Sequence, residues 1–348
     1  MRLIFVAPST RHPSGGVAVI YEMAAAMARR GHDAHLYHVN FFGATASTLD
    51  EVGWFSFPDG LTHYFAPGGP RDLTAIPDGD VFFGFPFDGR MAPQSGLPVV
   101  LIQGYRMLGD AIERHAFAVP CPKVCVAGWL VEAGREVGVP ANELVHVPIG
   151  VRHDRYRVTR PVASRPPRLS FCYSRHTQKG PELAIDVITR VKRAVPGVEV
   201  VAFGAKPPEH ALPGWVSYVT QPSPRRLVED IYNTSRVFLC TSRVEGFGLT
   251  NIEAMACGAA LVTTDNGGSR DYALHDDTAL VAPYGDVEAL ADHVVALLEE
   301  DDRGVAIASA GREYVERFDW ERSAELLEAF LERYLADPAA YGHRGRPA

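Results

Sequence analysis

The sequence predicts an α/β fold with two doubly wound domains, each built on a parallel sheet of its own. The chain has 348 residues, which is enough for about two domains. Short apolar runs alternate with helix-like stretches, as they do in parallel sheets that are covered by helices. The alternation stops in a proline- and arginine-rich segment at residues 158–167 and then starts again, which is typical of a linker between domains.

The first half of the chain contains apolar runs that suit buried parallel strands. These runs span residues 2–7, 34–39, 81–85, 98–103, 123–127 and 144–149. A turn with Gly15 and Gly16 follows the first run. An apolar stripe then predicts a helix at residues 17–30, which ends at Gly31.

The second half repeats this pattern and ends in an amphipathic helix at residues 321–335. The predicted strands span residues 169–173, 199–203, 237–241 and 259–264, and the predicted helices span 181–194, 225–234 and 249–257. The predicted domains are residues 1–160 and 161–318, followed by a helical segment at 319–336 that packs back on the first domain and a flexible tail at 337–348. Ligands of such sheets bind at the carboxyl ends of the strands, so we expect the site in the cleft between the two domains.

Composition argues against several classes of protein. The net charge of -8 gives no basic field for nucleic acid. The chain lacks a run of about 18 apolar residues, which a membrane span needs, and its apolar N-terminus is too short for a signal peptide. The sequence gives no support for association with a membrane surface. Five cysteines without CxxC spacing favour a reduced, cytoplasmic setting and do not indicate a zinc site.

The most informative stretch is residues 242–258, where an apolar strand leads into a glycine-bearing turn and then a helix. The turn reads Gly246, Phe247, Gly248, and the helix begins at about Leu249. The two glycines leave backbone amides uncovered at the helix N-terminus. Together with the helix dipole, these amides predict a site for an anion such as a phosphate.

Two carboxylates flank this predicted anion site. Glu245 precedes the helix, and Glu253 lies about one turn inside it. A carboxylate only accepts hydrogen bonds and can take two from a vicinal diol, such as that of a ribose. The alternative interpretation is a helix bracketed by glycines, with two solvated glutamates.

A second constellation follows the first predicted strand of the second domain. Arg175 and Lys179 lie in a strand-to-helix turn, and Lys179 is one of four lysines in the chain. A guanidinium and an ammonium can converge on a diphosphate. The alternative is a pair of surface cations.

These residues resemble a known signature. The spacing of Glu245 and Glu253 resembles the E-x7-E motif of retaining glycosyltransferases of the GT-B fold, family four in the usual classification. The resemblance covers nearly the whole chain, because residues 144–151, 265–268 and 318–320 are also similar to family segments. The loop with Gly15 and Gly16 resembles the donor loop of the family.

The resemblance implies two Rossmann-like domains that face each other across a cleft, with the acceptor on the first domain and a nucleotide-diphosphate sugar on the second. It assigns the ribose to Glu253 and the donor sugar to Glu245, and it makes Arg175 and Lys179 a phosphate clamp. It also implies front-face attack with retention of configuration, in which the leaving phosphate accepts the proton of the acceptor. No metal or other cofactor is expected.

Other contacts are predicted less directly. The base pocket is expected near Phe203, Gly204 and Gln221, where nothing distinguishes uracil, guanine or adenine. Gln103 and Tyr105 end an apolar strand of the first domain and are candidate acceptor or sugar contacts. Many family members have a histidine in this region. Residues 149–152 also depart from the family pattern, so the sugar and the acceptor stay open, as does the oligomeric state.

Alternative functions remain open at this stage. Asp78 and Asp80 form a DxD motif, which is a metal site in the other glycosyltransferase fold, but Asp-Gly before an apolar run is ordinary turn chemistry. The same fold could also serve a sugar phosphorylase, a nucleotide-sugar epimerase or a non-catalytic nucleotide-sugar-binding protein. The combination of Glu245 and Glu253 with Arg175 and Lys179 favours a catalyst.

Overall fold

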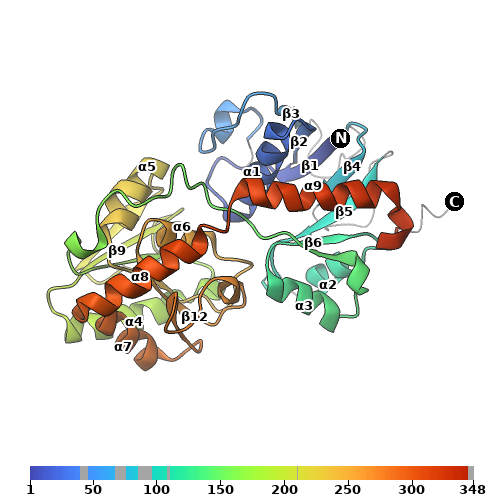
Figure 1. Cartoon of the computed structure of the whole chain (residues 1–348). Helices are drawn as coiled ribbons and strands as arrows, with labels where there is room; N and C mark the ends of the chain where they lie inside the picture. Colours follow the sequence, from blue (N-terminus) through green and yellow to red (C-terminus); the bar gives the residue numbers. More distant parts are fainter. Residues whose placement is uncertain (40–45, 67–75, 85–95, 108–109, 210, 344–348) are drawn as a thin grey trace. The chain divides into compact units, whose positions relative to one another are not determined.

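The computed structural model describes residues 1–39, 46–66, 76–84, 96–107, 110–209 and 211–343, and its contacts divide the chain into two units (Figure 1). The first unit comprises Met1–Gly150 and Trp320–Ala348, and the second comprises Val151–Asp319. Within the described residues, each unit is built on one parallel sheet. This confirms the predicted fold class.

The sheet of the first unit has the strand order β3-β2-β1-β4-β5-β6-β7. The strands are β1 (Arg2–Pro8), β2 (Asp33–Val39), β3 (Thr62–Phe65), β4 (Val81–Gly84), β5 (Leu97–Ile102), β6 (Lys123–Cys125) and β7 (Leu144–His146). The central strand β1 is buried from Leu3 to Val6, which explains its unbroken apolar run. Sequence reasoning missed β3, a half-exposed edge strand without such a run. Phe85, predicted to end β4, lies outside the described residues.

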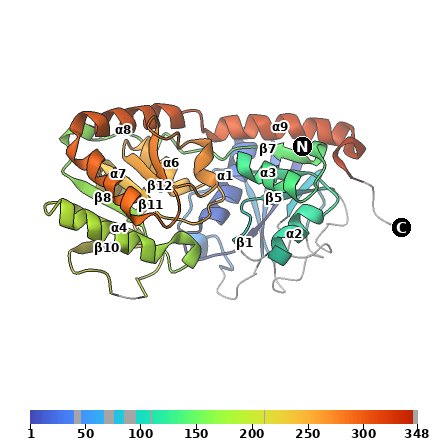
Figure 2. The ribbon, with the colours of Figure 1, turned by 90° about the horizontal axis from the view of Figure 1, so that it is seen from below.

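Four helices cover the described part of this sheet, and two of them pack side by side. The helices are α1 (Gly15–Arg29), α2 (Asp110–Ala118), α3 (Gly128–Glu136) and α9 (Trp320–Ala336). Helix α9 packs against α1, and Figure 2 shows α9 as a long helix near the C-terminus. Arg29 Nε lies 2.8 Å from Glu321 Oε1, and Glu328 bonds to Arg30 and His32. The chain therefore returns to the first unit after the second unit is complete.

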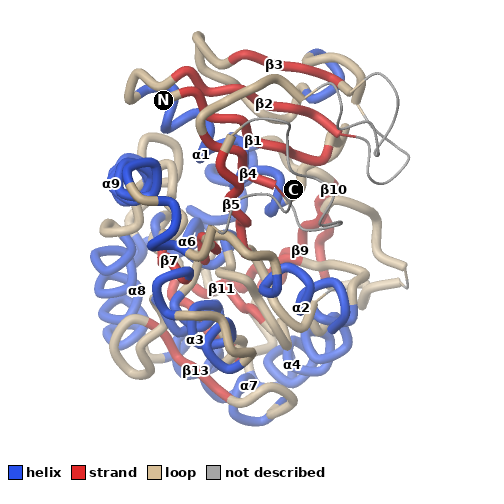
Figure 3. Tube along the Cα trace, turned by 90° about the vertical axis from the view of Figure 1, so that its right-hand side faces the viewer, coloured by secondary structure: helices blue, strands red, loops and turns tan. Residues whose placement is uncertain are grey.

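The sheet of the second unit has the strand order β10-β9-β8-β11-β12-β13. The strands are β8 (Arg168–Cys172), β9 (Glu199–Gly204), β10 (Val216–Thr220), β11 (Val237–Cys240), β12 (Ala260–Thr264) and β13 (Ala279–Ala282). The helices are α4 (Pro181–Ala194), α5 (Pro224–Arg226), α6 (Leu249–Ala256), α7 (Val287–Glu299) and α8 (Asp301–Val315) (Figure 3). Apolar residues of α4, α7 and α8 pack with those of β8 and β11 in one core.

The predicted helix at 225–234 takes three different forms. It begins as the single turn α5, continues as a π-helical turn at Leu227–Ile231, and ends as a 3-10 turn at Tyr232–Thr234. The change of pitch brings Tyr232 and Asn233 into the interior of the unit, where they are at most 1% exposed. The Tyr232 side chain contributes to the site described below.

The predicted boundary at 160/161 differs from the division of the structure, which falls at 150/151. The reason is that residues 151–160 pack on the second unit. Asn233 Oδ1 accepts a hydrogen bond from Thr159 N at 2.7 Å, and Asn233 Nδ2 donates to Arg157 O at 3.0 Å. The predicted tail also begins with structure, a 3-10 turn at Pro338–Tyr341 held by Asn142. Residues 344–348 lie outside the described residues.

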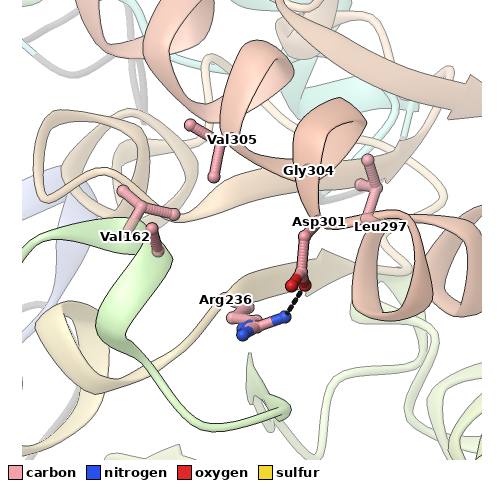
Figure 4. A pocket seen from close by; sticks show the side chains of 7 residues that line it. Val162, Arg236, Leu297, Asp301, Gly304 and Val305 are labelled. Atoms are coloured by element: carbon pink, nitrogen blue, oxygen red, sulfur yellow. Dashed lines mark hydrogen bonds and ion pairs between the residues drawn. The ribbon is translucent and has the colours of Figure 1, made fainter.

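A small pocket lies at the amino ends of the strands of the second unit, where Arg236 precedes β11. It is lined by Val162, Ala163, Arg236, Leu297, Asp301, Gly304 and Val305 (Figure 4). Arg236 and Asp301 form an ion pair at this pocket. Ligands of parallel sheets bind at the opposite, carboxyl end, so the pocket is not part of the candidate site.

A buried histidine on β2 gives the first unit an expected sensitivity to acid. His38 is 1% exposed; its ring lies 3.3 Å from the Tyr21 hydroxyl and 3.0 Å from His63 Nδ1. Burial lowers the pKa of His38 to about 3, from 6.5. The folded state therefore binds this proton less readily than the unfolded chain. The resulting stability is complete above pH 6.5 and is lost as the pH falls toward 3.

Replacing His38 by phenylalanine is expected to make stability less dependent on pH, because phenylalanine cannot take up a proton. The measurement is the melting temperature at about pH 7 and about pH 4.5, where wild type loses more stability than the variant. His115→Phe, at an exposed position of α2, is the control and should leave the pH dependence unchanged. Equal acid losses in wild type and His38→Phe would contradict the assignment.

Candidate functional site

The turn before α6 brings backbone amides to the carboxyl end of the second sheet. Gly248 adopts a left-handed conformation with φ of 100°, and a Cβ at this position would lie 2.5 Å from the Tyr272 hydroxyl. Both facts require glycine here. The N–H groups of Leu249 and of the residue after it have no acceptor inside the helix, so they and the helix dipole provide a place for an anion.

The side chain of Phe247 anchors this turn. Phe247 is 2% exposed, and its ring centroid lies 5.3 Å from those of Tyr272 and Phe318. The Tyr272 hydroxyl donates a hydrogen bond to Phe247 O at 2.8 Å. Phe247, which was predicted to contact the donor, therefore fixes the turn through its buried ring, and only its backbone is left to face a ligand.

The structure brings Lys179 and Glu245 together. Lys179 Nζ lies 2.7 Å from both carboxylate oxygens of Glu245, and Ser242 Oγ donates to Glu245 Oε1 at 2.6 Å. Glu245 is 7% exposed. Although burial by itself would lower the pKa of Lys179, the adjacent Glu245 carboxylate raises it above its ordinary value. The ammonium therefore stays charged at neutral pH.

A close contact between two loops places Lys179. Gly180 has a φ of 60°, and a Cβ there would lie 2.2 Å from the carbonyl oxygen of Thr241. Thr241 Oγ1 donates to Gly180 O at 2.9 Å. The turn after β8 is thereby held against the end of β11, which explains why residues 66 positions apart in sequence form the ion pair.

Glu253 is held by two tyrosines that sequence reasoning missed. The Tyr232 hydroxyl donates to Glu253 Oε2 at 3.1 Å, and Tyr156 also hydrogen-bonds to this carboxylate. Burial, followed by the charge of Glu253, raises the pKa of both phenols. Neither tyrosine belongs to a recognisable motif, and Tyr156 lies just before the segment predicted to be a linker, so no local signal could have identified them.

The two glutamates and Lys179 surround the end of β8. Cys172, the last residue of that strand, is exposed and lies within electrostatic range of Lys179, Glu245 and Glu253. A cation, two acids and the amides at the start of α6 thus share the carboxyl end of one sheet, the place where ligands of such sheets bind.

Arg175, which was predicted to bind a diphosphate together with Lys179, has a different set of contacts from Lys179. Its Nε and Nη2 donate to Pro207 O at 3.0 Å and 2.7 Å, and its charge acts on Tyr218 of β10. The physical reason is that the loop after β9 presents a carbonyl that the guanidinium can bind with two nitrogens. In the described part of the chain, Arg175 is therefore engaged by this loop and not by the pair of Lys179 and Glu245.

The residues predicted for the base pocket differ in what they expose. Phe203 is 4% exposed and packs its ring edge-on against Tyr232, so its side chain belongs to the core. A Cβ at Gly204 would lie 2.4 Å from Tyr173 O. Gln221, with a φ of 45°, donates from Nε2 to Ala205 O at 2.9 Å. Gly204 and Gln221 thus lie together at the carboxyl ends of β9 and β10.

In the first unit, one of the two predicted acceptor contacts lies beside the glycine loop. A Cβ at Gly16 would lie 3.4 Å from Gln103 Oε1, and Gly15 and Gly16 are the first two residues of α1. Tyr105 is 4% exposed and packs against Phe117. Gln103 is therefore adjacent to the glycines, whereas the Tyr105 ring is part of the core.

Asp80 of the DxD motif has a structural role. Asp80 Oδ2 accepts a hydrogen bond from Arg2 N at 2.7 Å, and Asp80 N donates to Arg2 O, which fixes the start of β1. Across the described ranges, no group of three or more His, Cys, Asp or Glu residues is placed to hold a metal ion. Over the same ranges, no helix has the length and apolar character needed to cross a bilayer.

Comparisons with known proteins agree with this geometry. Residues 160–314 match the model of the family described as glycosyl transferases group 1. The GDP-mannose-dependent alpha-(1-6)-phosphatidylinositol monomannoside mannosyltransferase of Mycobacterium tuberculosis is 29% identical over 218 residues, which are 55% of this chain and 56% of that protein. The chain thus spans about half the length of this curated relative.

Two solved structures share the fold over nearly the whole chain. Sucrose-phosphate synthase from Thermosynechococcus elongatus has a TM-score of 0.77 at 16% identity, and the alignment covers 97% of this chain and 100% of the synthase chain. Anabaena Alr3699/HepE in complex with UDP-glucose has a TM-score of 0.74 at 14% identity, with coverage of 96% and 100%. Residues 160–314 of the chain thus match the glycosyl transferases group 1 family, and its two parallel sheets have the GT-B fold.

Proposed function

We propose that the chain is a retaining glycosyltransferase that moves a sugar from a nucleotide-diphosphate donor to a hydroxyl acceptor without a metal ion. The observation that carries this proposal is the pair of Lys179 and Glu245, joined at 2.7 Å beside the N-terminus of α6. It places a cation beside the amides at the start of α6, where a diphosphate would leave. Glu253, on the same helix, is left for the ribose.

In the proposed reaction the bond between the anomeric carbon and the diphosphate oxygen breaks. The acceptor oxygen bonds to the same face of that carbon, and the acceptor proton passes to the leaving phosphate. Negative charge grows on the diphosphate in the transition state. Lys179 and the amides at the start of α6 stabilise that charge, and removing one such donor costs about 2.7–4 kcal/mol in other enzymes.

Replacing Glu253 by alanine is expected to weaken binding of nucleoside diphosphates about 10- to 100-fold, because two hydrogen bonds from a diol to a charged group are lost. Isothermal titration calorimetry measures the change. The matched control is Glu229→Ala, which removes an exposed carboxylate paired with Arg225. Unchanged affinity in Glu253→Ala would exclude the ribose role.

The donor class is tested by thermal shift with UDP, GDP, ADP and TDP. GDP is the first choice because the mycobacterial relative is named for GDP-mannose. The matching nucleotide sugar is then incubated with candidate acceptors, and NMR of the product reports whether the anomeric configuration is retained. Turnover with free phosphate and no nucleotide would instead establish a phosphorylase.

Transfer is expected to be insensitive to EDTA, because Lys179 and the α6 amides already supply the positive charge that a metal would bring. The measurement is the initial rate before and after chelation. Loss of activity that manganese restores would contradict this proposal and would revive a metal role for Asp78 and Asp80.

We assign acceptor binding to the first unit, through Gln103, and we assign a contact with the donor to the loop with Gly15 and Gly16. The name of the mycobacterial relative is compatible with a glycolipid acceptor, and polysaccharides and small natural products are the other classes to screen. A cytoplasmic location is also part of the proposal, and the five free cysteines support it.

A further inference from the structure

Glu253 differs from an ordinary surface carboxylate because buried phenols occupy one side of it. Tyr232 is 0% exposed and donates to Glu253 Oε2 at 3.1 Å, and Tyr156 hydrogen-bonds to the same carboxylate. Glu253 itself is only half-buried. The two phenols therefore set the orientation of the carboxylate from its buried side.

The surroundings of Tyr232 prevent it from turning away. Its ring packs edge-on against Phe203 at 5.8 Å and Phe238 at 5.6 Å, and it lies 6.3 Å from the ring of Tyr156. Rings that pack edge to face keep a defined orientation. The phenol hydroxyl can thus reach Glu253 in one position only.

The Arg165 guanidinium binds both segments that form the hydrogen bond between Tyr232 and Glu253. Arg165 donates to Tyr232 O at 3.2 Å and to Cys257 O at 2.6 Å. Cys257 ends α6, and its N–H bonds to the carbonyl of Glu253. The backbones that carry the donor and the acceptor are therefore held at a fixed separation.

We propose that Tyr156 and Tyr232 are positioning residues that fix the Glu253 carboxylate for a vicinal diol, so that this chain selects ribonucleoside diphosphates over their 2′-deoxy counterparts. The inference rests on the proposed function. A carboxylate held in place gains two hydrogen bonds from a ribose diol and one from a deoxyribose. If the carboxylate rotates freely, part of this difference in binding free energy between the ribose and deoxyribose forms is lost, because the carboxylate must be ordered when the ligand binds.

The test compares GDP with 2′-deoxy-GDP by isothermal titration calorimetry, and repeats the comparison with UDP and ADP and their deoxy forms. Wild type is expected to bind the ribose form about tenfold or more tightly, because the deoxy form lacks one hydrogen bond to a charged group. Tyr232→Phe and Tyr156→Phe keep the rings and remove the hydroxyls. Each is expected to reduce the preference at least about threefold.

The matched control is Tyr334→Phe in the first unit, whose buried hydroxyl donates to Pro98 O at 3.0 Å. It loses a comparable hydrogen bond far from Glu253 in sequence and should keep the wild-type preference. In a Glu253→Ala background, Tyr232→Phe should have no further effect on the ratio. If Tyr232→Phe does not fold, Tyr156→Phe, whose ring is less buried, carries the test.

The possible outcomes distinguish a failure of this inference from a failure of the proposed function on which it rests. If none of the ribonucleoside diphosphates binds, the proposed function fails and the selectivity fails with it. If they bind and Glu253→Ala abolishes the preference, but both tyrosine variants keep the wild-type ratio, the function stands and the positioning role is overturned. A wild type that binds both sugar forms equally also overturns it.

Discussion

Replacing Lys179 by methionine is expected to lower kcat about 10²- to 10³-fold. Methionine keeps most of the apolar stem but removes the charge that faces the departing diphosphate, and the loss of one such donor has this magnitude elsewhere. KM for the donor should change less than kcat, because charge on the leaving group is greatest in the transition state. Steady-state kinetics with the donor found by thermal shift measure both constants.

Two control variants separate the chemistry from the folding. Lys192→Met removes a lysine whose Nζ bonds to Pro196 O and Val198 O at the end of α4, and it should keep wild-type kcat. Lys179→Met also leaves Glu245 buried without its cation, which destabilises the fold. The double variant Lys179→Met, Glu245→Gln should recover melting temperature and stay inactive. Recovery of activity in the double variant would assign Lys179 a structural role only.

The parts of the fold that could be predicted from sequence are those that local chemistry determines. Strands such as β1 and β11 are buried on both faces, so their apolar runs stand out. The turn at Gly248 was predictable because its backbone conformation requires glycine. Strand β10 was not, because it is a half-exposed edge strand with mixed polarity, and the π-helical turn at Leu227–Ile231 has no sequence signature of its own.

The site residues divide in the same way, into those that a local motif identifies and those whose positions depend on distant parts of the chain. Lys179 and Glu245 were predicted because each lies in a recognisable motif, and the contact between Gly180 and Thr241 then brings them together. The position of Arg175 depends on a carbonyl 32 residues away, and a motif does not record such a partner. Tyr156 reaches Glu253 from 97 residues earlier in the sequence. Composition marked the region after residue 157 as a linker, although it packs against the site.

Arg165 shows how this region acts on the site, and its replacement by methionine is expected to destabilise the second unit by about 3–5 kcal/mol. The side chain is 1% exposed, and it satisfies the carbonyls of Arg160, Tyr232, Ser235 and Cys257. Burial lowers the pKa of its guanidinium to about 10, which still leaves it charged at neutral pH. Methionine would leave several buried carbonyls without a hydrogen-bond donor, and each costs about 1–3 kcal/mol. Relaxation of the structure recovers part of this loss.

This loss corresponds to a fall in melting temperature of about 10 °C or more for a domain of this size. Differential scanning calorimetry measures it. Arg160→Met is the matched control, because the side chain of Arg160 is exposed and its one hydrogen bond runs to Ser164 O in the same segment. Arg165→Lys keeps the charge but reaches fewer carbonyls, so it should fall between wild type and Arg165→Met. A change of less than about 2 °C in Arg165→Met would mean that the carbonyls find other donors. The segment before β8 would then be the simple linker that its composition suggests.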